Sequence, residues 1–270
     1  MSFYTSLNGM KNAQTSLGVI AHNISNSETY GFKRSRTEFS EIVAGSALTN
    51  PRMIQGIGSS VESITQNFSL GPVEQTGSAL DLAITGDGFF TTRSASDGST
   101  LYTRSGSFSM TESGNIADSA GNRLQVFAVD ANGQVTGNAI GDAQVPPVNA
   151  NGSEFAGVTV TATGIVQASY ADGTVEPVGA VALASFISPT GLKKVGSANW
   201  EGTGLSGAAT YGSPGTGAYG SLLSGALERS NVDIAEELVG LITAQRNFQA
   251  NAKAIDTATQ ISQTVINLRT

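Results

Sequence analysis

The side chains best suited to acid–base or metal chemistry are scarce in this sequence. His22 is the only histidine, and cysteine is absent. A lone histidine without cysteine cannot build a Cys/His zinc site, and a catalytic histidine needs a nucleophile and an orienting carboxylate. His22 falls within a predicted helix beside its apolar stripe, so we expect a surface or interface residue. The sequence predicts no catalytic residue and no metal ligand.

Glycine-rich and acidic segments offer no better site. Residues 202–207 and 215–220 both match G-x-G-x-x-G, but a dinucleotide fingerprint must follow a strand and open a helix. Both matches fall in one Gly/Ser-rich stretch that we expect to be a loop. Residues 130–133 resemble the start of a calcium loop but lack its later ligands, so a hairpin turn is expected. The other candidate carboxylates form no evident acid/base pair; they are Asp81, Asp87, Glu112 and Asp118. No cofactor is predicted.

The composition narrows the class of protein. The chain has 270 residues, of which 13% are charged, and a formal net charge of -7. A nucleic-acid binder needs a basic face, so this balance argues against one. No apolar stretch approaches the ~20 residues of a membrane span, and the first residues lack the features of a secretory signal. We expect no membrane insertion and no cleaved signal peptide. Low charge suits surfaces that meet other copies of the chain.

Both ends of the chain carry apolar residues at helical spacing. Residues 2–27 contain no proline, and their apolar side chains recur seven apart with a four-residue offset. The carboxyl-terminal end repeats the pattern from residue 234 onward, with Asn231 or Asp233 as its expected cap. This spacing is the a/d pattern of a coiled-coil seam. The predicted assembly seam consists of Phe3, Leu7, Met10, Leu17, Ile24, Ile234, Leu238, Leu241, Phe248, Ile255, Val265 and Leu268.

The middle of the chain predicts strands. Short runs rich in β-branched and aromatic residues alternate with turn pairs such as Asp87-Gly88 and Asn132-Gly133. Such spacing is typical of a sandwich or a barrel-like domain. The predicted fold class is α+β, with paired amino- and carboxyl-terminal coiled-coil-like helices and a central all-β domain. The predicted strands span 80–85, 88–92, 123–129, 158–161, 165–170 and 180–187.

These elements define the expected domains. Residues 1–32 and 225–270 form a terminal helical assembly domain, and 33–224 form a central β-rich domain. Within the central domain, 33–75 are expected to be a linker that makes contacts between subunits, and 136–157 a surface loop. One helix pair buries little area alone, so each apolar stripe needs a partner. Head-to-tail contacts that do not close into a ring would give a helical filament.

Three separated segments carry motifs in a fixed order. Residues 23–33 read N-I-S-N-S-E-T-Y-G-F-K; 80–108 contain L-D-L-A-I, G-D-G-F-F and Y-T-R-S-G-S-F; 230–252 contain S-N-V-D and A-Q-R-N-F-Q-A-N-A. Together they resemble the flagellar axial proteins of the hook and rod, whose first motif is N-I-A-N-x-x-T-x-G-F-K, here with serine in place of alanine. The motif residues carried over are Asn23, Asn26, Gly31, Phe32, Lys33, Asn231, Gln245 and Arg246.

The resemblance implies a structural protein, not an enzyme, that polymerises into a hollow helical tube lined by its terminal helices. Residues 199–200, 212–217, 224–228 and 265–269 resemble hook members more than rod members. The expected function is therefore that of the extracellular hook, a flexible joint that transmits torque from rod to filament. Its implied partners are further copies of itself, the distal rod protein, the hook cap and hook–filament junction proteins, and the flagellar export apparatus.

Length is the one departure from the hook pattern. Hook members are longer, with outer β domains inserted where this chain has only the segment near 136–157. A rod protein of the basal body, distal or proximal, is therefore the alternative.

Overall fold

The chain folds into two compact units, each assembled from segments that are distant in the sequence. The computed structural model describes residues 2–44 and 55–267. Unit 1 consists of Met1–Ser27, Arg34–Asn67 and Val232–Thr270, and unit 2 of Glu28–Lys33 and Phe68–Asn231. Helices near both ends and strands between them make the protein α+β, as predicted. Within the described ranges, none of the helices combines the length and hydropathy that crossing a membrane requires.

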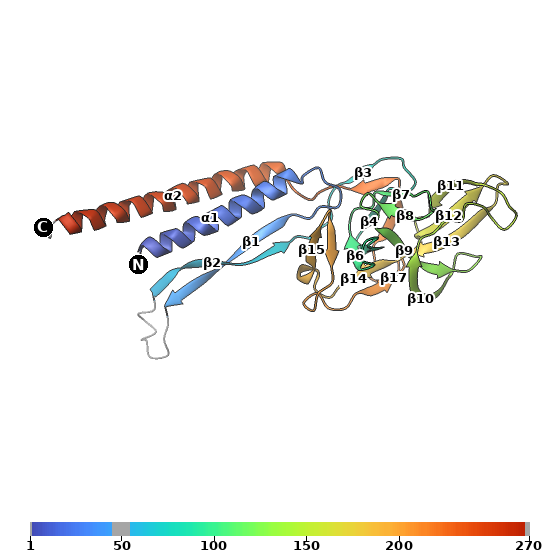
Figure 1. Cartoon of the computed structure of the whole chain (residues 1–270), viewed down its shortest axis with the longest axis horizontal. Helices are drawn as coiled ribbons and strands as arrows, with labels where there is room; N and C mark the ends of the chain where they lie inside the picture. The colour runs from blue at the N-terminus through green and yellow to red at the C-terminus, as the bar shows by residue number, and fades with distance from the viewer. Residues whose placement is uncertain (1, 45–54, 268–270) are drawn as a thin grey trace. The chain divides into compact units, whose positions relative to one another are not determined.

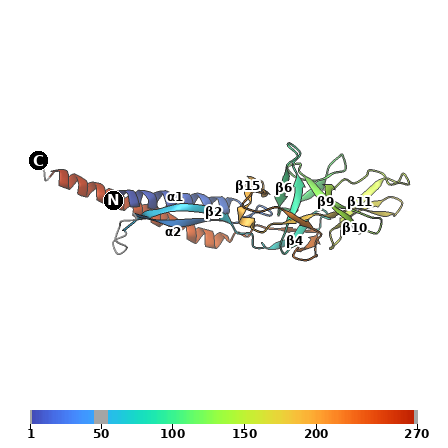
Figure 2. The same ribbon diagram turned by 90° about the horizontal axis from the view of Figure 1, so that it is seen from below.

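Unit 1 is built on two helices, α1 (Ser2–Ser25) and α2 (Ile234–Asn267). They lie side by side and run in opposite directions (Figures 1 and 2). Gly9 of α1 lies against Asn251 of α2, which fixes their register. Because far more of α2 follows Asn251 than of α1 precedes Gly9, the last turns of α2 extend past the start of α1. The pairing of the two ends is thus present, whereas coiled-coil geometry stays a prediction.

The contact between α1 and α2 uses small residues. A side chain at Gly9 would collide with its neighbour, since a Cβ there would lie 2.5 Å from Asn251 Oδ1. Ala13 and Ala244 are the only buried apolar side chains among the described residues of unit 1. Small side chains allow two helices to pack at short interaxial distance. The heptad pattern, which selects large residues, does not identify these positions.

Polar residues define the start of α2. Oδ1 of Asp233 accepts the backbone N–H groups of Ala235 and Glu236 at 2.8 and 3.2 Å. One of the two predicted caps is therefore confirmed. Glu236 and Glu237 occupy the first turn, where the helix dipole favours negative charge.

A long antiparallel hairpin completes unit 1. Its strands are β1 (Ser35–Ala44) and β2 (Gln55–Gln66). Asn12 of α1 holds the hairpin, because its Nδ2 donates to the carbonyl oxygen of Ser59 at 2.9 Å and to the hydroxyl of Ser59 at 2.8 Å. The linker expected over 33–75 is therefore largely paired structure, and residues 34–67 belong with the helices instead of the central domain. The backbone ladder and the contact with α1, which sequence spacing does not reveal, account for the difference.

Unit 2 is an all-β domain dominated by one large antiparallel sheet. Its strands are β3 (Val73–Gln75), β4 (Leu82–Thr85), β5 (Phe89–Arg93), β6 (Thr100–Thr103), β7 (Phe108–Met110), β8 (Ile116–Asp118), β9 (Arg123–Val129), β10 (Val135–Asp142), β11 (Phe155–Val160), β12 (Ile165–Tyr170), β13 (Val175–Val181), β14 (Leu183–Ser185), β15 (Lys193–Gly196), β16 (Asn199–Glu201), β17 (Thr210–Gly212), β18 (Ser221–Ser224) and β19 (Ala226–Glu228), with a short 3-10 turn, η2, at Pro189–Gly191. The main path of the sheet is β11-β12-β13-β9-β5-β6-β16-β15. Two short pairs, β18 with β4 and β19 with β3, accompany it.

The core of unit 2 consists of apolar side chains that are shielded from solvent. Leu82, Ile84 and Phe90 are completely buried in its largest apolar cluster. A second cluster contains Phe89 and Trp200, whose rings pack edge to face 5.9 Å apart. Phe89 and Phe90 are adjacent on β5 and belong to different clusters, so both faces of this strand are buried.

The segment 136–157 differs from the predicted surface loop. Strand β10 occupies its first part and pairs with β9. Ala143 and Val145 then enter the core cluster, and the N–H of Val145 donates to the carbonyl oxygen of Gly114 at 2.7 Å. Most side chains of β10 are exposed, so hydrogen bonds and not an apolar face define the strand. A strand of this kind carries no apolar alternation for sequence analysis to detect.

Candidate functional site

The Gly-Phe-Lys motif lies in unit 2, where all three residues are buried. Gly31 has a φ of +68°, and a Cβ at this position would lie 2.3 Å from the backbone nitrogen of Ser105. The N–H of Gly31 donates to the carbonyl oxygen of Glu228 at 2.8 Å. Only glycine suits this conformation and approach. The ring of Phe32 lies 4.4 Å from the ammonium of Lys194, in a cation–π contact.

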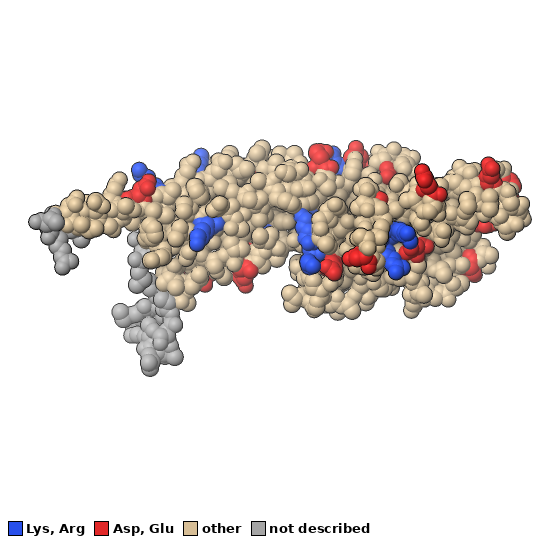
Figure 3. Space-filling model, viewed as in Figure 1, with Lys and Arg blue, Asp and Glu red and all other residues tan. Residues whose placement is uncertain are grey.

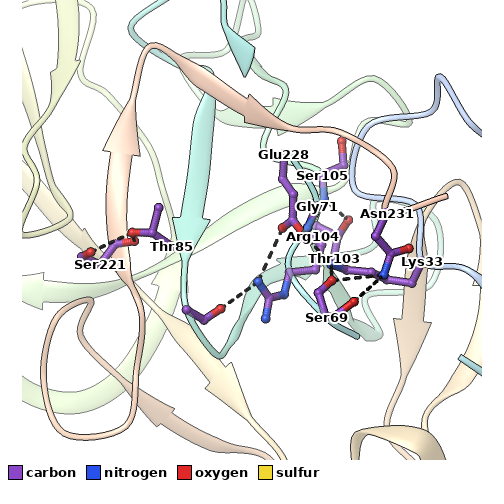
Figure 4. Close-up of polar contacts among 11 residues, drawn as sticks. Lys33, Ser69, Gly71, Thr85, Thr103, Arg104, Ser105, Ser221, Glu228 and Asn231 are labelled. Carbon is purple, nitrogen blue, oxygen red and sulfur yellow. Dashed lines mark hydrogen bonds and ion pairs between the residues drawn. The ribbon is translucent and has the colours of Figure 1, made fainter. Parts of the chain in front are cut away.

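Lys33 enters a buried ion cluster centred on Glu228 (Figure 4). Its Nζ lies 2.5 Å from Glu228 Oε1, and both side chains are 0% exposed. Arg104, which is also buried, approaches Oε2 at 3.5 Å. Lys33 Nζ donates further to the carbonyl oxygen of Ser69 at 2.7 Å, and Oε1 accepts the N–H of Gly71 at 2.9 Å. Two cations therefore share one carboxylate, and backbone groups of Ser69 and Gly71 supply further hydrogen bonds.

Burial governs the charges of this cluster. Desolvation lowers the pKa of Lys33, and attraction to Glu228 offsets only part of the effect. Desolvation also lowers the pKa of Arg104, opposed by the charges of Glu228 and Asp87. Breaking a buried ion pair by removing one partner costs about 3–5 kcal/mol. The cluster is sealed from solvent, so the arrangement suits a structural connection and not proton transfer.

A second polar network joins α1, β1 and α2 within unit 1. Asn23 is buried; its Nδ2 donates to the carbonyl oxygen of Ser35 at 2.8 Å and to Glu237 at 3.1 Å, and its Oδ1 accepts the N–H of Ser35 at 2.9 Å. Arg34 pairs with Glu237 at 2.6 Å and with Glu236 at 2.9 Å. Burial opposes the charge of Arg34, but the two carboxylates outweigh it and raise its pKa. The motif asparagine thus fixes the turn of the chain from helix into strand.

The other motif residues are divided between interior contacts and surface. Asn26 donates from Nδ2 to a carbonyl oxygen one turn earlier in α1, at 2.8 Å. Asn231 donates at 3.1 Å to the same Ser69 carbonyl oxygen that accepts from Lys33. Gln245 and Arg246 are exposed on α2. The structure therefore brings Asn231 near the Gly-Phe-Lys motif and leaves the A-Q-R segment on the helix surface.

The predicted assembly seam is only partly covered in a single chain. Its half-buried members are Leu7, Met10, Leu17, Ile24, Leu241, Phe248 and Ile255. Its exposed members are Phe3, Ile234 and Leu238, at 42%, 44% and 48%. Val265 lies in the last turns of α2, and Leu268 lies outside the described residues. The role of the seam in assembly stays a prediction.

Further apolar side chains are exposed on α2 outside the seam. They are Val239, Ile242, Ile261 and Ile266. Few charged side chains lie over the helices in the face shown in Figure 3. Exposed apolar surface of this extent on a helix pair is suited to contact with another molecule.

Comparison with known proteins agrees with these motifs. Three family models match in chain order: flagella basal body rod protein at residues 3–33, flagellar hook protein FlgE/F/G D1 domain at 83–168, and flagellar basal body rod FlgEFG protein C-terminal at 223–268. The flagellar basal-body rod protein FlgG of Bacillus subtilis (strain 168) is 36% identical over 280 residues, covering 99% of this chain and 98% of that protein. The chain belongs to the flagellar hook and rod protein family. The prediction of the family from its motifs is confirmed.

Hook proteins are also similar to this axial protein. The flagellar hook protein FlgE of Salmonella typhimurium (strain LT2) is 28% identical over 411 residues, covering 100% of both chains. A crystal structure of Helicobacter pylori flagellar hook protein FlgE2 matches 72% of this chain and 43% of its own, with 13% identity and a TM-score of 0.24. Members of this family are structural proteins that polymerise in the flagellum.

His22 and Asp130, which could act in acid–base or metal chemistry, lie on the surface and at a turn of this axial protein. His22 is exposed on α1. Asp130 accepts the backbone N–H groups of Asn132 and Gln134 at 3.0 and 2.7 Å, closing the predicted turn between β9 and β10. Within the described ranges, no group of three or more His, Asp or Glu side chains could hold a metal ion.

Sequence reasoning missed the partners of the motif lysine and asparagine. Glu228 and Arg104 lie in segments that resemble the family, yet neither is predicted as a site residue. The available signal was chemical: Glu228 ends a short apolar run, and in a chain with 13% charged residues such a carboxylate calls for a buried cation.

Proposed function

We propose that this chain is a structural subunit of the flagellar rod, polymerising with copies of itself into part of the hollow axis of the basal body. The observation that carries the proposal is the match in length. The alignment with the rod protein takes 280 positions and covers nearly all of both chains. The alignment with the hook protein takes 411 positions for the same 270 residues, so that relative has long segments without a counterpart in this chain.

The segment 136–157 supports the same assignment. Outer domains of hook members are expected in this region. Here β10 continues through the buried Ala143 and Val145 to β11, with only short turns between them. All of these residues are described, and none of them forms an additional domain.

The helices of unit 1 supply a reason to polymerise. Their exposed apolar side chains are removed from water only by contact with a further molecule, at about 25 cal/mol per Å² buried. In a rod, neighbouring copies would cover these faces through unlike surfaces, and such contacts build an open helical assembly. The terminal helices would then line the export channel, and their few charged groups would leave its wall weakly interacting with passing chains.

The flagellar hook is the second candidate. The segments at 199–200 and 265–269 resemble hook members, and the hook alignment also spans the whole chain. In that case the same exposed helix faces would hold the tube together while the outer surfaces slide during bending.

Electron microscopy of labelled flagella tests the proposal. A short epitope inserted between Asn151 and Gly152, an exposed turn of unit 2, marks the protein with gold in purified hook–basal bodies. The tagged strain must still swim, and an untagged strain provides the background. Gold on the straight segment within the envelope is the expected result. Gold on the curved segment outside the cell would overturn the rod assignment in favour of the hook.

A further inference from the structure

Three segments of unit 2 flank the points where the chain passes to and from unit 1. These segments are 28–33, 68–72 and 228–231. All three converge on the carboxylate of Glu228 (Figure 4). Lys33 reaches it from the first segment and Gly71 from the second, and Glu228 itself begins the third. A single buried side chain thus contacts every crossing segment.

Backbone and side-chain bonds add a second layer around the carboxylate. The N–H of Gly31 donates to the carbonyl oxygen of Glu228 at 2.8 Å, and the N–H of Arg229 donates to that of Pro72 at 2.8 Å. Lys33 and Asn231 share the carbonyl oxygen of Ser69. Each segment is therefore bonded to both of the others.

Arg104 anchors this arrangement to the body of unit 2. Its Nη1 donates to the carbonyl oxygen of Gly86 at 3.0 Å and lies 3.5 Å from Glu228. Its guanidinium lies 5.2 Å from the centre of the Phe89 ring, which belongs to the second core cluster. The crossing segments are thus tied to the sheet as well as to one another.

The presence of charged side chains at this buried position indicates its role. Well-packed apolar side chains can match or exceed the stability of a buried ion pair, so burial alone does not call for charge. A shift in register that separates a buried charge from its partner leaves that charge unpaired, which costs free energy. A shift between apolar side chains leaves no unpaired charge. We propose that the Glu228 cluster is a clamp that sets the register of the three crossing segments and so fixes where the helices and hairpin of unit 1 leave unit 2. This inference holds for either segment of the flagellar axis.

Hydrogen exchange on the full chain tests the clamp. In the Glu228→Gln variant, amide exchange in 28–33, 68–72 and 228–231 is expected to rise at least about tenfold, while β9 and β12 keep their protection. Glu112→Gln is the matched control, because Glu112 is an exposed carboxylate in the turn between β7 and β8, outside the three segments. Its exchange should equal that of the unaltered chain. Unchanged exchange in the three segments of Glu228→Gln would overturn the proposal.

A second variant separates register from stability. The triple change Lys33→Met, Arg104→Met and Glu228→Leu replaces the ions with apolar side chains of similar size. It is expected to keep the protection of β9 and β12 but to leave the crossing segments exchanging faster than in the unaltered chain. Full protection of those segments in the triple variant would mean that burial suffices, and the clamp would be refuted. If neither variant folds, the cluster supports the whole of unit 2, and the specific role in register is likewise refuted.

Discussion

Unit 1 and unit 2 of this flagellar axial protein differ in how much apolar surface each buries. In unit 2, side chains such as Leu82, Ile84 and Phe90 are removed completely from solvent. Among the described residues of unit 1, only Ala13 and Ala244 are buried apolar side chains. Hydrophobic burial is the main favourable term in folding, so unit 2 has an internal source of stability that unit 1 lacks. We therefore expect unit 1 to depend on contacts with neighbouring molecules.

The two units resemble each other in their buried polar residues. Asn23 and Glu237 form a sealed contact in unit 1, and Lys33 and Glu228 form one in unit 2. Both contacts join residues about 200 positions apart, at places where the chain changes direction. Asn23 and Lys33 of the first motif thus fix the path of the chain.

The largest expected effect tests the dependence of unit 1 on neighbours. Replacing both Leu17 and Ile24 with Asp places charges on the half-buried face of α1. The double variant should remain monomeric, and cells carrying it should be non-motile, because charged side chains disfavour apolar contacts between subunits. Sedimentation of the purified protein and swimming assays measure the two outcomes.

Gln14→Asp is the control for this double variant, since Gln14 is exposed on the same helix. It should assemble normally. Unit 2 should unfold at the same temperature in all three proteins. Normal polymers from the double variant would show that the predicted seam plays no part in assembly.

The same substitution made in each unit gives the next largest effect. Phe90→Ala removes a completely buried ring from the core of unit 2 and should cost about 3–5 kcal/mol of its unfolding free energy. Phe248→Ala, at a half-buried position of α2, should leave the unfolding of unit 2 unchanged and weaken polymerisation. The fluorescence of Trp200, the only tryptophan, reports on unit 2 during urea unfolding. Equal losses from the two changes would contradict the contrast between the units.

Sequence patterns predicted the elements of this fold that have an apolar period. The strands predicted at 123–129 and 165–170 coincide with β9 and β12, and both terminal helices are present. The strands β1 and β2 and strand β10 were missed, because hydrogen bonds to a neighbouring strand define them. The sequence of a strand does not by itself identify the strand with which it pairs.

The candidate site shows the same limit at the level of single residues. The motif identifies Gly31 and Lys33, but the residues that explain them lie far away in the sequence. Gly31 meets the backbone of Ser105, and Lys33 meets Glu228, 195 positions later. Spacing along the chain predicts contacts within one element and not contacts between segments that only the fold brings together.

The smallest expected effect concerns an ion pair at the rim of unit 2. Burial opposes ionisation of Asp142, but hydrogen bonds from Gln125 and Arg123 outweigh it and lower its pKa. A carboxyl whose pKa falls on folding stabilises the protein above its unfolded pKa, about 3.9, and loses that contribution as the pH falls through its folded pKa. Asp142→Asn should therefore reduce the stability of unit 2 at pH 7 by less than about 1 kcal/mol, and the difference should vanish in acid.

Melting of both proteins at pH 7 and at about pH 2.5 measures this difference, with Glu112→Gln as the control at an exposed turn carboxylate. A gap between Asp142→Asn and the unaltered chain that persists undiminished in acid would mean that the side chain acts by packing and not by charge. Closing of the gap would show that the charge of Asp142 supplies this contribution, through its bonds to Gln125 and Arg123.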